Sequence, residues 1–247
     1  MHPLKAGVQQ GLAELKLTLS DGQVDQLLAY MDLIQKWTKV YNLTAVRDPV
    51  EMLTHHLLDS LAVIHPLRMQ VAGLDRLGAA GQAVADASHG VAAVAGSGVS
   101  PSNGGAVCRL LDVGSGAGLP GVVIAICCPE LTVHCVDTVG KKAAFIQQVA
   151  ATLKLPNLRG VHSRVEALTD QYDIVSSRAF ASLVDFTSWS VNALAEQGVW
   201  MGMKGKHPAD EIQALPSTVQ VFHVEQLVVP GLDAERCIVW MRPARSS

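Results

Sequence analysis

The chain has 247 residues, a net charge of −3 and a hydrophobic fraction of 49%. That fraction is sufficient for a large buried core, and an aromatic content of 4% makes the core mainly aliphatic. A charge of −3 excludes binding of a polyanion through the charge of the whole molecule, so nucleic acid would require a local basic patch. Five cysteines without a CxxC pair indicate reduced thiols rather than a secreted disulfide framework.

Two segments bear on targeting. The N-terminus lacks the continuous apolar stretch of a signal peptide. The longest apolar run, 117–128, contains Gly and Pro and is too short to span a bilayer. We therefore expect a soluble, cytoplasmic protein.

The first part of the chain predicts a helical cap over residues 1–68. Apolar residues recur every three or four positions over 21–43. A second helix begins with Asp48 as N-cap, Pro49 in the first helical position and Glu51 in a capping-box position. Its expected apolar stripe consists of Val50, Leu53, Leu57, Leu61 and Ile64.

Residues 69–107 differ in composition, being rich in Ala, Gly, Ser and Val. The segment has no aromatic residue that could anchor a core, so we expect a loose insertion or linker, with at most one weak helix. A core domain then follows over 108–247.

Strand and helix patterns alternate through this domain. Expected strands are 107–113, 131–137, 158–162, 172–177 and 198–203, and expected helices are 121–128, 141–153 and 182–195. The helix over 141–153 should bury Ala144, Phe145, Val149 and Leu153 on one face. The alternation predicts a doubly wound, mostly parallel α/β sheet. Two final strands, 219–229 and 236–241, form a hairpin and add one antiparallel strand.

The segment LLDVGSGAGLPG follows the first of these strands and contains a cofactor-binding pattern. Gly116, Gly118 and Gly121 satisfy G-x-G-x-x-G, and Asp137 ends the second strand 21 residues after Gly116. This spacing suits an acid that binds the ribose of a dinucleotide. S-adenosylmethionine requires the same acid, so NAD and S-adenosylmethionine both remain candidates.

Two residues favour S-adenosylmethionine. Asp112 directly precedes the turn, where its carboxylate could meet the methionine ammonium group but would repel a pyrophosphate. Pro120 removes a backbone N–H near the start of the helix, where a pyrophosphate needs donors. A ligand without phosphate loses nothing by this.

The whole pattern resembles the RsmG (GidB) family, through WTKVYNLTAVRDP, HHLLDS, LLDVGSGAGLPG, VDTVGKKAAF, SRVE, SRAFASL and KGKHPADEI in that order. The resemblance covers the chain except for 69–107. It implies a Rossmann-like class I methyltransferase that transfers a methyl group from S-adenosylmethionine to N7 of a guanine in the decoding region of 16S ribosomal RNA. The insertion is a departure from typical members, which join the cap to the first strand by a few residues.

Site residues follow from the resemblance where the motifs match. Gly114 and Leu119 would touch the cofactor, as would the turn residue Gly116. Val165 and Glu166 would flank the adenine. Arg178 would reach into the cofactor site from the end of the fourth strand.

The chemistry needs no general base, because guanine N7 carries a lone pair and no proton. The enzyme can act by holding donor and acceptor in line. Arg178 and Lys204 are the candidate catalytic residues, with Arg178 in contact with cofactor or guanine and Lys204 near the target base.

Basic residues at predicted strand ends could position RNA through its phosphates. The candidates are Lys141, Lys142, Arg164, Lys206 and His207, and Lys36, Lys39 and Arg47 of the cap could extend the footprint. Trp37, Tyr41 and Phe180 could stack on a splayed base, although core packing is the better interpretation of Trp37.

The expected partner is 16S ribosomal RNA or a precursor of the small ribosomal subunit, bound by a monomer without a membrane or a metal. His55 and Asp59 share a helix face, but no third metal ligand is indicated. The alternative functions are an NAD-linked oxidoreductase and a non-catalytic ribosome-associated module that binds an adenosyl nucleotide.

Overall fold

A computed structural model of the chain describes residues 2–74, 107–179 and 182–244. Most of the expected insertion over 69–107 therefore lies outside the described residues, as does Phe180. Among the described residues, no helix is long and apolar enough to cross a membrane.

The N-terminal part is helical, as predicted. It contains α1 (Lys5–Glu14), α2 (Asp21–Tyr41), α3 (Pro49–Met52), a π-helical turn η1 (Leu53–Leu58) and α4 (Asp59–Leu61), and residues 64–74 are helical as well. The Asp48 carboxylate accepts hydrogen bonds from the backbone N–H groups of Val50 and Glu51, which confirms its role as N-cap.

Two details differ from the expected cap. Val50 is 62% exposed, because it lies in the first turn of α3, away from the buried face that begins with Met52 and Leu53. The helix over 64–74 also continues past the expected boundary at 68. The further course of this segment lies outside the described residues.

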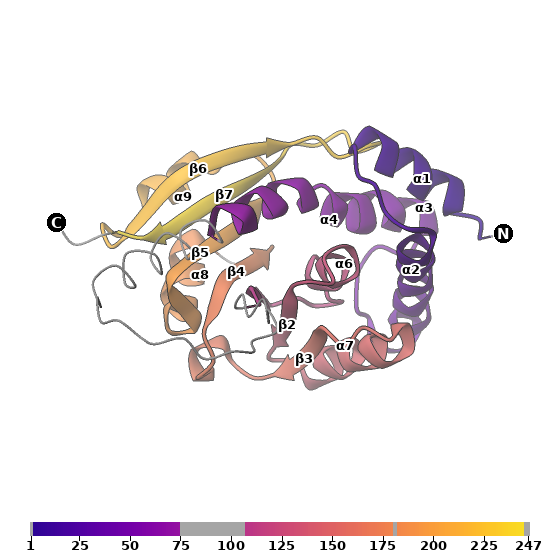
Figure 1. Ribbon diagram of the computed structural model, residues 1–247, viewed down its shortest axis with the longest axis horizontal. Coiled ribbons are helices and arrows are strands. Elements are labelled where there is room, and N and C mark those ends of the chain that lie inside the picture. Colours follow the sequence, from indigo (N-terminus) through magenta and orange to yellow (C-terminus); the bar gives the residue numbers. More distant parts are fainter. Residues whose placement is uncertain (1, 75–106, 180–181, 245–247) are drawn as a thin grey trace, which may run out of the picture.

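Seven strands form one sheet in the order β3-β2-β1-β4-β5-β7-β6 (Figure 1). The strands are β1 (Arg109–Val113), β2 (Thr132–Asp137), β3 (Leu158–His162), β4 (Tyr172–Arg178), β5 (Leu194–Lys204), β6 (Val219–Leu227) and β7 (Arg236–Pro243). Neighbours from β3 to β5 pair in parallel, whereas β7 is antiparallel to both β5 and β6. Of the described strands only β7 runs against the others, so the expected topology is confirmed.

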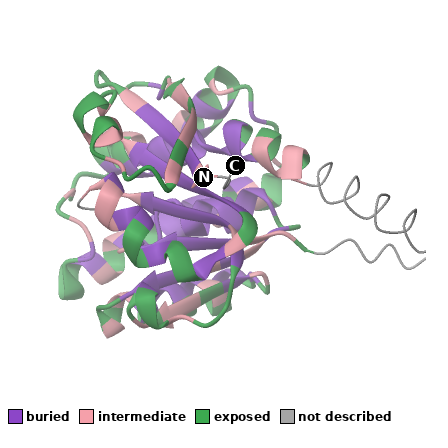
Figure 2. Cartoon of the chain, turned by 90° about the vertical axis from the view of Figure 1, so that its left-hand side faces the viewer, coloured by how far each residue is buried: buried purple, intermediate pink, exposed green. Residues whose placement is uncertain are grey.

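Helices cover both faces of the sheet, and Figure 2 shows the buried strands between them. The cap helices pack with α6 (Gly121–Cys127) and α7 (Gly140–Leu153) on one face. The other face is covered by α8 (Leu183–Ser190), α9 (Ala209–Gln213) and the short turns η2 (Val165–Ala167) and η3 (Val191–Ala193). On α7, Phe145, Val149 and Leu153 are buried as predicted, but the prediction for Ala144 was wrong. Ala144 is exposed, and Ala143 and Ile146 complete the inner face.

Side chains of the cap bind backbone groups of the domain. Gln23 and Arg68 donate to carbonyl oxygens at the C-terminus of α6, and Gln26 donates to the last carbonyl of α7. These carbonyls have no partner within their own helices. The Tyr30 hydroxyl, fully buried, donates to the carbonyl oxygen of Ala117 at 2.7 Å. The cap thereby holds both the helices and the glycine-rich turn.

Replacing Tyr30 by Phe should lower the free energy of unfolding by about 1–3 kcal/mol, because the buried carbonyl of Ala117 would lose its donor. Urea denaturation measures the change. Tyr41→Phe is the matched control, since this ring is 40% exposed, and it should stay within about 0.5 kcal/mol of the parent. Equal stability of the Tyr30→Phe variant and the parent would contradict the role of the hydroxyl.

Candidate functional site

The glycine-rich turn joins β1 to α6 at the carboxyl end of the parallel strands. Gly114, Gly116 and Gly118 have φ values of 67°, 59° and 90°, in the left-handed region that glycine adopts without strain. A Cβ atom at Gly121 would collide with the Cys135 sulfur and the Asp112 side chain. The glycines are therefore required by the path of the backbone and by the close approach of α6 to the sheet.

Asp112 lies beneath this turn and is fully buried. One carboxyl oxygen accepts from the Gly121 N–H at 3.1 Å, and the other accepts from the Ser176 hydroxyl at 2.9 Å. Burial raises the pKa of Asp112 to about 7, although the two hydrogen bonds favour the charged form. The residue thus ties β1 to β4 and to the start of α6.

Asp137 ends β2 and is 6% exposed. Its carboxylate accepts from the N–H groups of Gly116 at 3.1 Å and Val139 at 2.8 Å, and the Lys142 ammonium lies 3.7 Å away. Each carboxylate oxygen retains a second lone pair for a ligand. The position matches that expected for an acid that binds a ribose.

A cavity of about 470 Å³ lies over the ends of β1, β2 and β3. Four of the expected cofactor residues line it: Gly114, Asp137, Val165 and Glu166. The expected RNA-binding residues Lys142 and Arg164 line the same cavity, together with Val113, Val136, Thr138, Val139, Ser163 and Trp189. Asp112, Gly116, Leu119 and Arg178 are not in its lining.

The lining residues that the sequence analysis missed fall into two kinds. Five of them lie at or just beyond the ends of β1, β2 and β3, where the predicted strands were an available signal: Val113, Val136, Thr138, Val139 and Ser163. Trp189 comes from α8, beyond β4 in the chain. Its approach to the end of β2 depends on how α8 packs, which a strand-by-strand interpretation does not reveal.

Arg178 lies where the cap meets the end of β4. Its guanidinium is 2.9 Å from the Asp59 carboxylate and donates to the carbonyl of His55 at 3.2 Å. Arg236 binds the other oxygen of Asp59 at 2.8 Å. One buried carboxylate thus fixes two arginines at the carboxyl edge of the sheet.

The two histidines beside Asp59 have different environments. His55 is exposed, whereas His56 is buried and its Nε2 atom lies 2.6 Å from the Thr44 hydroxyl. Burial, assisted by the charge of Arg178, lowers the pKa of His56. In the part of the chain that the structure describes, no three His, Cys, Asp or Glu residues are grouped so that they could hold a metal ion.

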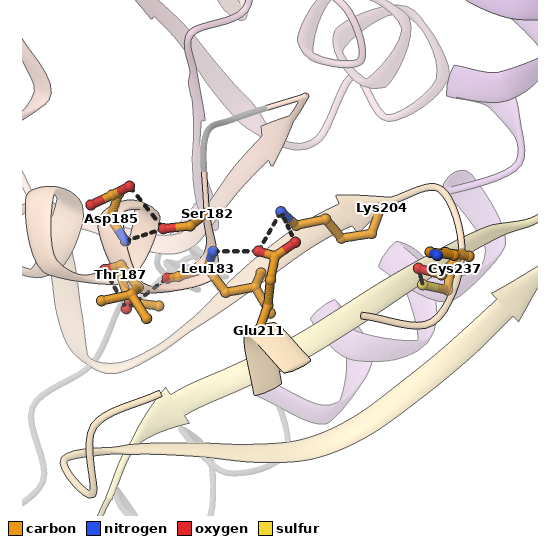
Figure 3. A network of polar contacts seen from close by, with 9 residues as sticks. Ser182, Leu183, Asp185, Thr187, Lys204, Glu211 and Cys237 are labelled. Carbon is orange, nitrogen blue, oxygen red and sulfur yellow. Dashed lines mark hydrogen bonds and ion pairs between the residues drawn. The ribbon is translucent and has the colours of Figure 1, made fainter. Parts of the chain in front are cut away.

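Lys204 ends β5 and binds Glu211 of α9 (Figure 3). Its ammonium lies 3.0 and 2.7 Å from the two carboxylate oxygens. Glu211 also accepts from the N–H of Leu183 at 2.8 Å, while the Ser182 hydroxyl caps α8 through Asp185 N–H. Lys204 is therefore fixed beside the N-terminus of α8.

The remaining candidates are dispersed. Lys141 and Lys206 are exposed, at the start of α7 and after β5 respectively. Trp37 has ring contacts with Tyr41 and with Phe145 of α7, at centroid distances of 5.1 and 5.3 Å. These contacts agree with the core-packing interpretation of Trp37.

A doubly wound sheet with a glycine turn after its first strand and an acid at the end of its second defines a nucleoside-cofactor-binding domain. A family model described as rRNA small subunit methyltransferase G matches residues 23–75 and 97–239. The chain belongs to this family of methyltransferases. Residues 76–96, which the family model leaves out, fall within the expected insertion.

Relatives named ribosomal RNA small subunit methyltransferase G are similar over nearly the whole chain. The protein from Albidiferax ferrireducens is 62% identical over 242 residues, with 98% of each chain covered. That from Polaromonas sp. strain JS666 is 63% identical over 235 residues, which is 95% of this chain and 92% of the relative. Among solved structures, TrmN from Thermus thermophilus has a TM-score of 0.46 and 17% identity, covering 56% of this chain and 44% of its own.

The family membership confirms the resemblance found in the sequence and the expectation of a methyltransferase with S-adenosylmethionine as cofactor. Neither the NAD-linked oxidoreductase nor the non-catalytic module receives support. The residues present fit the cofactor, because the Asp137 carboxylate and the apolar side chains of Val139 and Val165 line one cavity.

The buried Asp112 should make stability depend on pH. Its folded pKa of about 7 exceeds the ordinary value of 3.8, so the folded protein keeps a proton that the unfolded chain releases. The resulting stabilisation is fully present below about pH 4 and is lost as the pH rises toward about 7, by up to about 1.4 kcal/mol per unit.

Asp112→Asn should remove this contribution. Urea denaturation of parent and variant across the same pH window measures it, and the variant should gain stability relative to the parent as the pH rises. A difference between the two proteins that does not change with pH would contradict the raised pKa.

Proposed function

We propose that this protein methylates N7 of a guanine in 16S ribosomal RNA, with S-adenosylmethionine as methyl donor. The observation that carries the proposal is the cavity in which an acid at the end of β2 faces the glycine turn, with Lys142 and Arg164 in the same lining. The printed names of the relatives support the substrate, and the resemblance to the RsmG family supports the position on the base.

The cofactor would be held by the residues that line the cavity. Asp137 would accept hydrogen bonds from the ribose hydroxyls, and Val165 and Glu166 would flank the adenine. Gly114 has no side chain and would let the cofactor approach the backbone of the turn closely. Gly116 and Leu119 would contribute through the shape of the turn, which Asp112 supports from below.

When bound, S-adenosylmethionine supplies a methyl group on a positively charged sulfur. The guanine N7 lone pair needs no deprotonation, so no general base is required of this chain. Its residues have to hold the target base in line with the methyl group and to exclude water. Positioning therefore provides most of the catalysis.

Arg178 and Lys204 are the residues that we propose for the target base. Both lie at the carboxyl edge of the sheet, and each is oriented by a carboxylate, Asp59 and Glu211 respectively. Such ion pairs limit the conformations of long side chains before the substrate arrives. Arg178 could thus serve the cofactor or the guanine, and Lys204 the guanine.

The RNA would be bound along the same edge. Lys141, Lys142, Arg164 and Lys206 would contact phosphates and so position the RNA without reading its sequence. The substrate would be 16S ribosomal RNA or a precursor of the small subunit, and we propose that a cytoplasmic monomer acts on it. We keep the division into a cap (1–68), an insertion (69–107) and a methyltransferase core (108–247) as part of this proposal.

Asp137→Asn should weaken binding of S-adenosylhomocysteine by about tenfold, since it replaces a charge-assisted acceptor of hydrogen bonds. Isothermal titration calorimetry measures the affinity. Asp173→Asn is the matched control, because Asp173 also accepts from a backbone N–H, that of Arg109, but at the amino end of β1. Unchanged affinity of the Asp137 variant would exclude Asp137 as the ribose acid.

The reaction is tested with purified protein, S-adenosylmethionine and small subunits from cells that lack the enzyme. Mass analysis of the RNA should show N7-methylguanine, and the RNA chain should be cleavable at that nucleotide after reduction, because methylation at N7 makes the glycosidic bond labile. An RNA with 7-deazaguanine at the target position should accept no methyl group, because it lacks the nucleophile. A methyl group on an exocyclic nitrogen, or transfer to the 7-deaza RNA, would overturn the proposal.

A further inference from the structure

Trp189 is an exposed aromatic residue at the cavity. It is the penultimate residue of α8, and 43% of it is exposed. Trp200 and Trp240, by contrast, are only 1% and 2% exposed. Leaving the apolar surface of an indole in contact with water costs free energy. The Trp189 indole lines the same cavity as Asp137.

The surroundings of Trp189 have the composition of a nucleobase site. Helix α8 packs against η2, which carries Val165 and Glu166. Val139, 36% exposed, lines the same cavity beyond the end of β2. Flat aromatic and aliphatic side chains around one opening provide the apolar faces on which a purine ring packs.

We propose that Trp189 forms part of the adenine subsite and contacts the base of the cofactor. The inference rests on the proposed function, in which Asp137 binds the ribose. A base attached to a ribose at Asp137 would lie among the lining residues that follow β2 and those of η2, and Trp189 of α8 lines the same cavity. The indole therefore contributes to affinity and to selection of an aromatic base.

The test is binding of S-adenosylhomocysteine to the full-length protein by isothermal titration calorimetry. Trp189→Ala should weaken binding on the order of tenfold, the usual effect of losing one base–aromatic contact. Trp189→Phe, which keeps an aromatic ring, should stay within about threefold of the parent. Val191→Ala is the matched control, since Val191 is 49% exposed just beyond α8 and is not in the cavity lining, and its affinity should not change.

Fluorescence gives a second measurement that does not depend on the stability of the alanine variant. Tryptophan emission of the parent should change on addition of S-adenosylhomocysteine, and this change should be absent in Trp189→Phe, which still binds. If the parent binds and Trp189→Ala binds equally well, or if the emission change persists in Trp189→Phe, the inference is wrong while the proposed function stands. If the parent does not bind S-adenosylhomocysteine, the proposed function fails as well.

Discussion

The glycine turn after β1 is the constraint on which the site depends. Its backbone adopts positive φ at three glycines, so the turn has little conformational preference of its own. Three side chains fix it instead: Asp137 accepts from Gly116 N–H, Asp112 accepts from Gly121 N–H, and Tyr30 donates to the carbonyl of Ala117. Two come from the sheet and one from the cap, so both layers hold the turn in place.

The cap also contacts the carboxyl edge of the sheet on the other side of the glycine turn, at β4 and β7. Asp59 binds Arg178 at the end of β4 and Arg236 at the start of β7. Because Asp59 is 2% exposed, its charge needs these partners to offset the cost of burial. Buried apolar side chains of the cap and of the sheet form one continuous cluster. The cap is thus a layer of the fold as well as a part of the site.

Much of the site could be predicted because its signals are local. The spacing of Gly116 and Asp137 reflects one strand–turn–helix–strand unit, whose geometry is nearly constant. Asp48 acts on its own helix within three residues. The errors at Val50 and Ala144 each concern a single residue at the border of a helix face, since valine and alanine occur on both the inner and the outer side of helices. Hydrophobic periodicity limits the inward-facing positions of a helix to a few residues, and tertiary packing decides which of these are buried.

The sequence by itself determined the class of fold, the order of its elements, the glycine turn and the acid that ends the second strand, since each depends on residues close together in the chain. The tertiary structure decided which distant residues meet. It placed Trp189 at the cavity, and it placed Asp59 between two arginines 119 and 177 residues away. The physical reason is that an ion pair or a cavity wall forms between side chains brought together by packing, and sequence spacing does not encode that proximity.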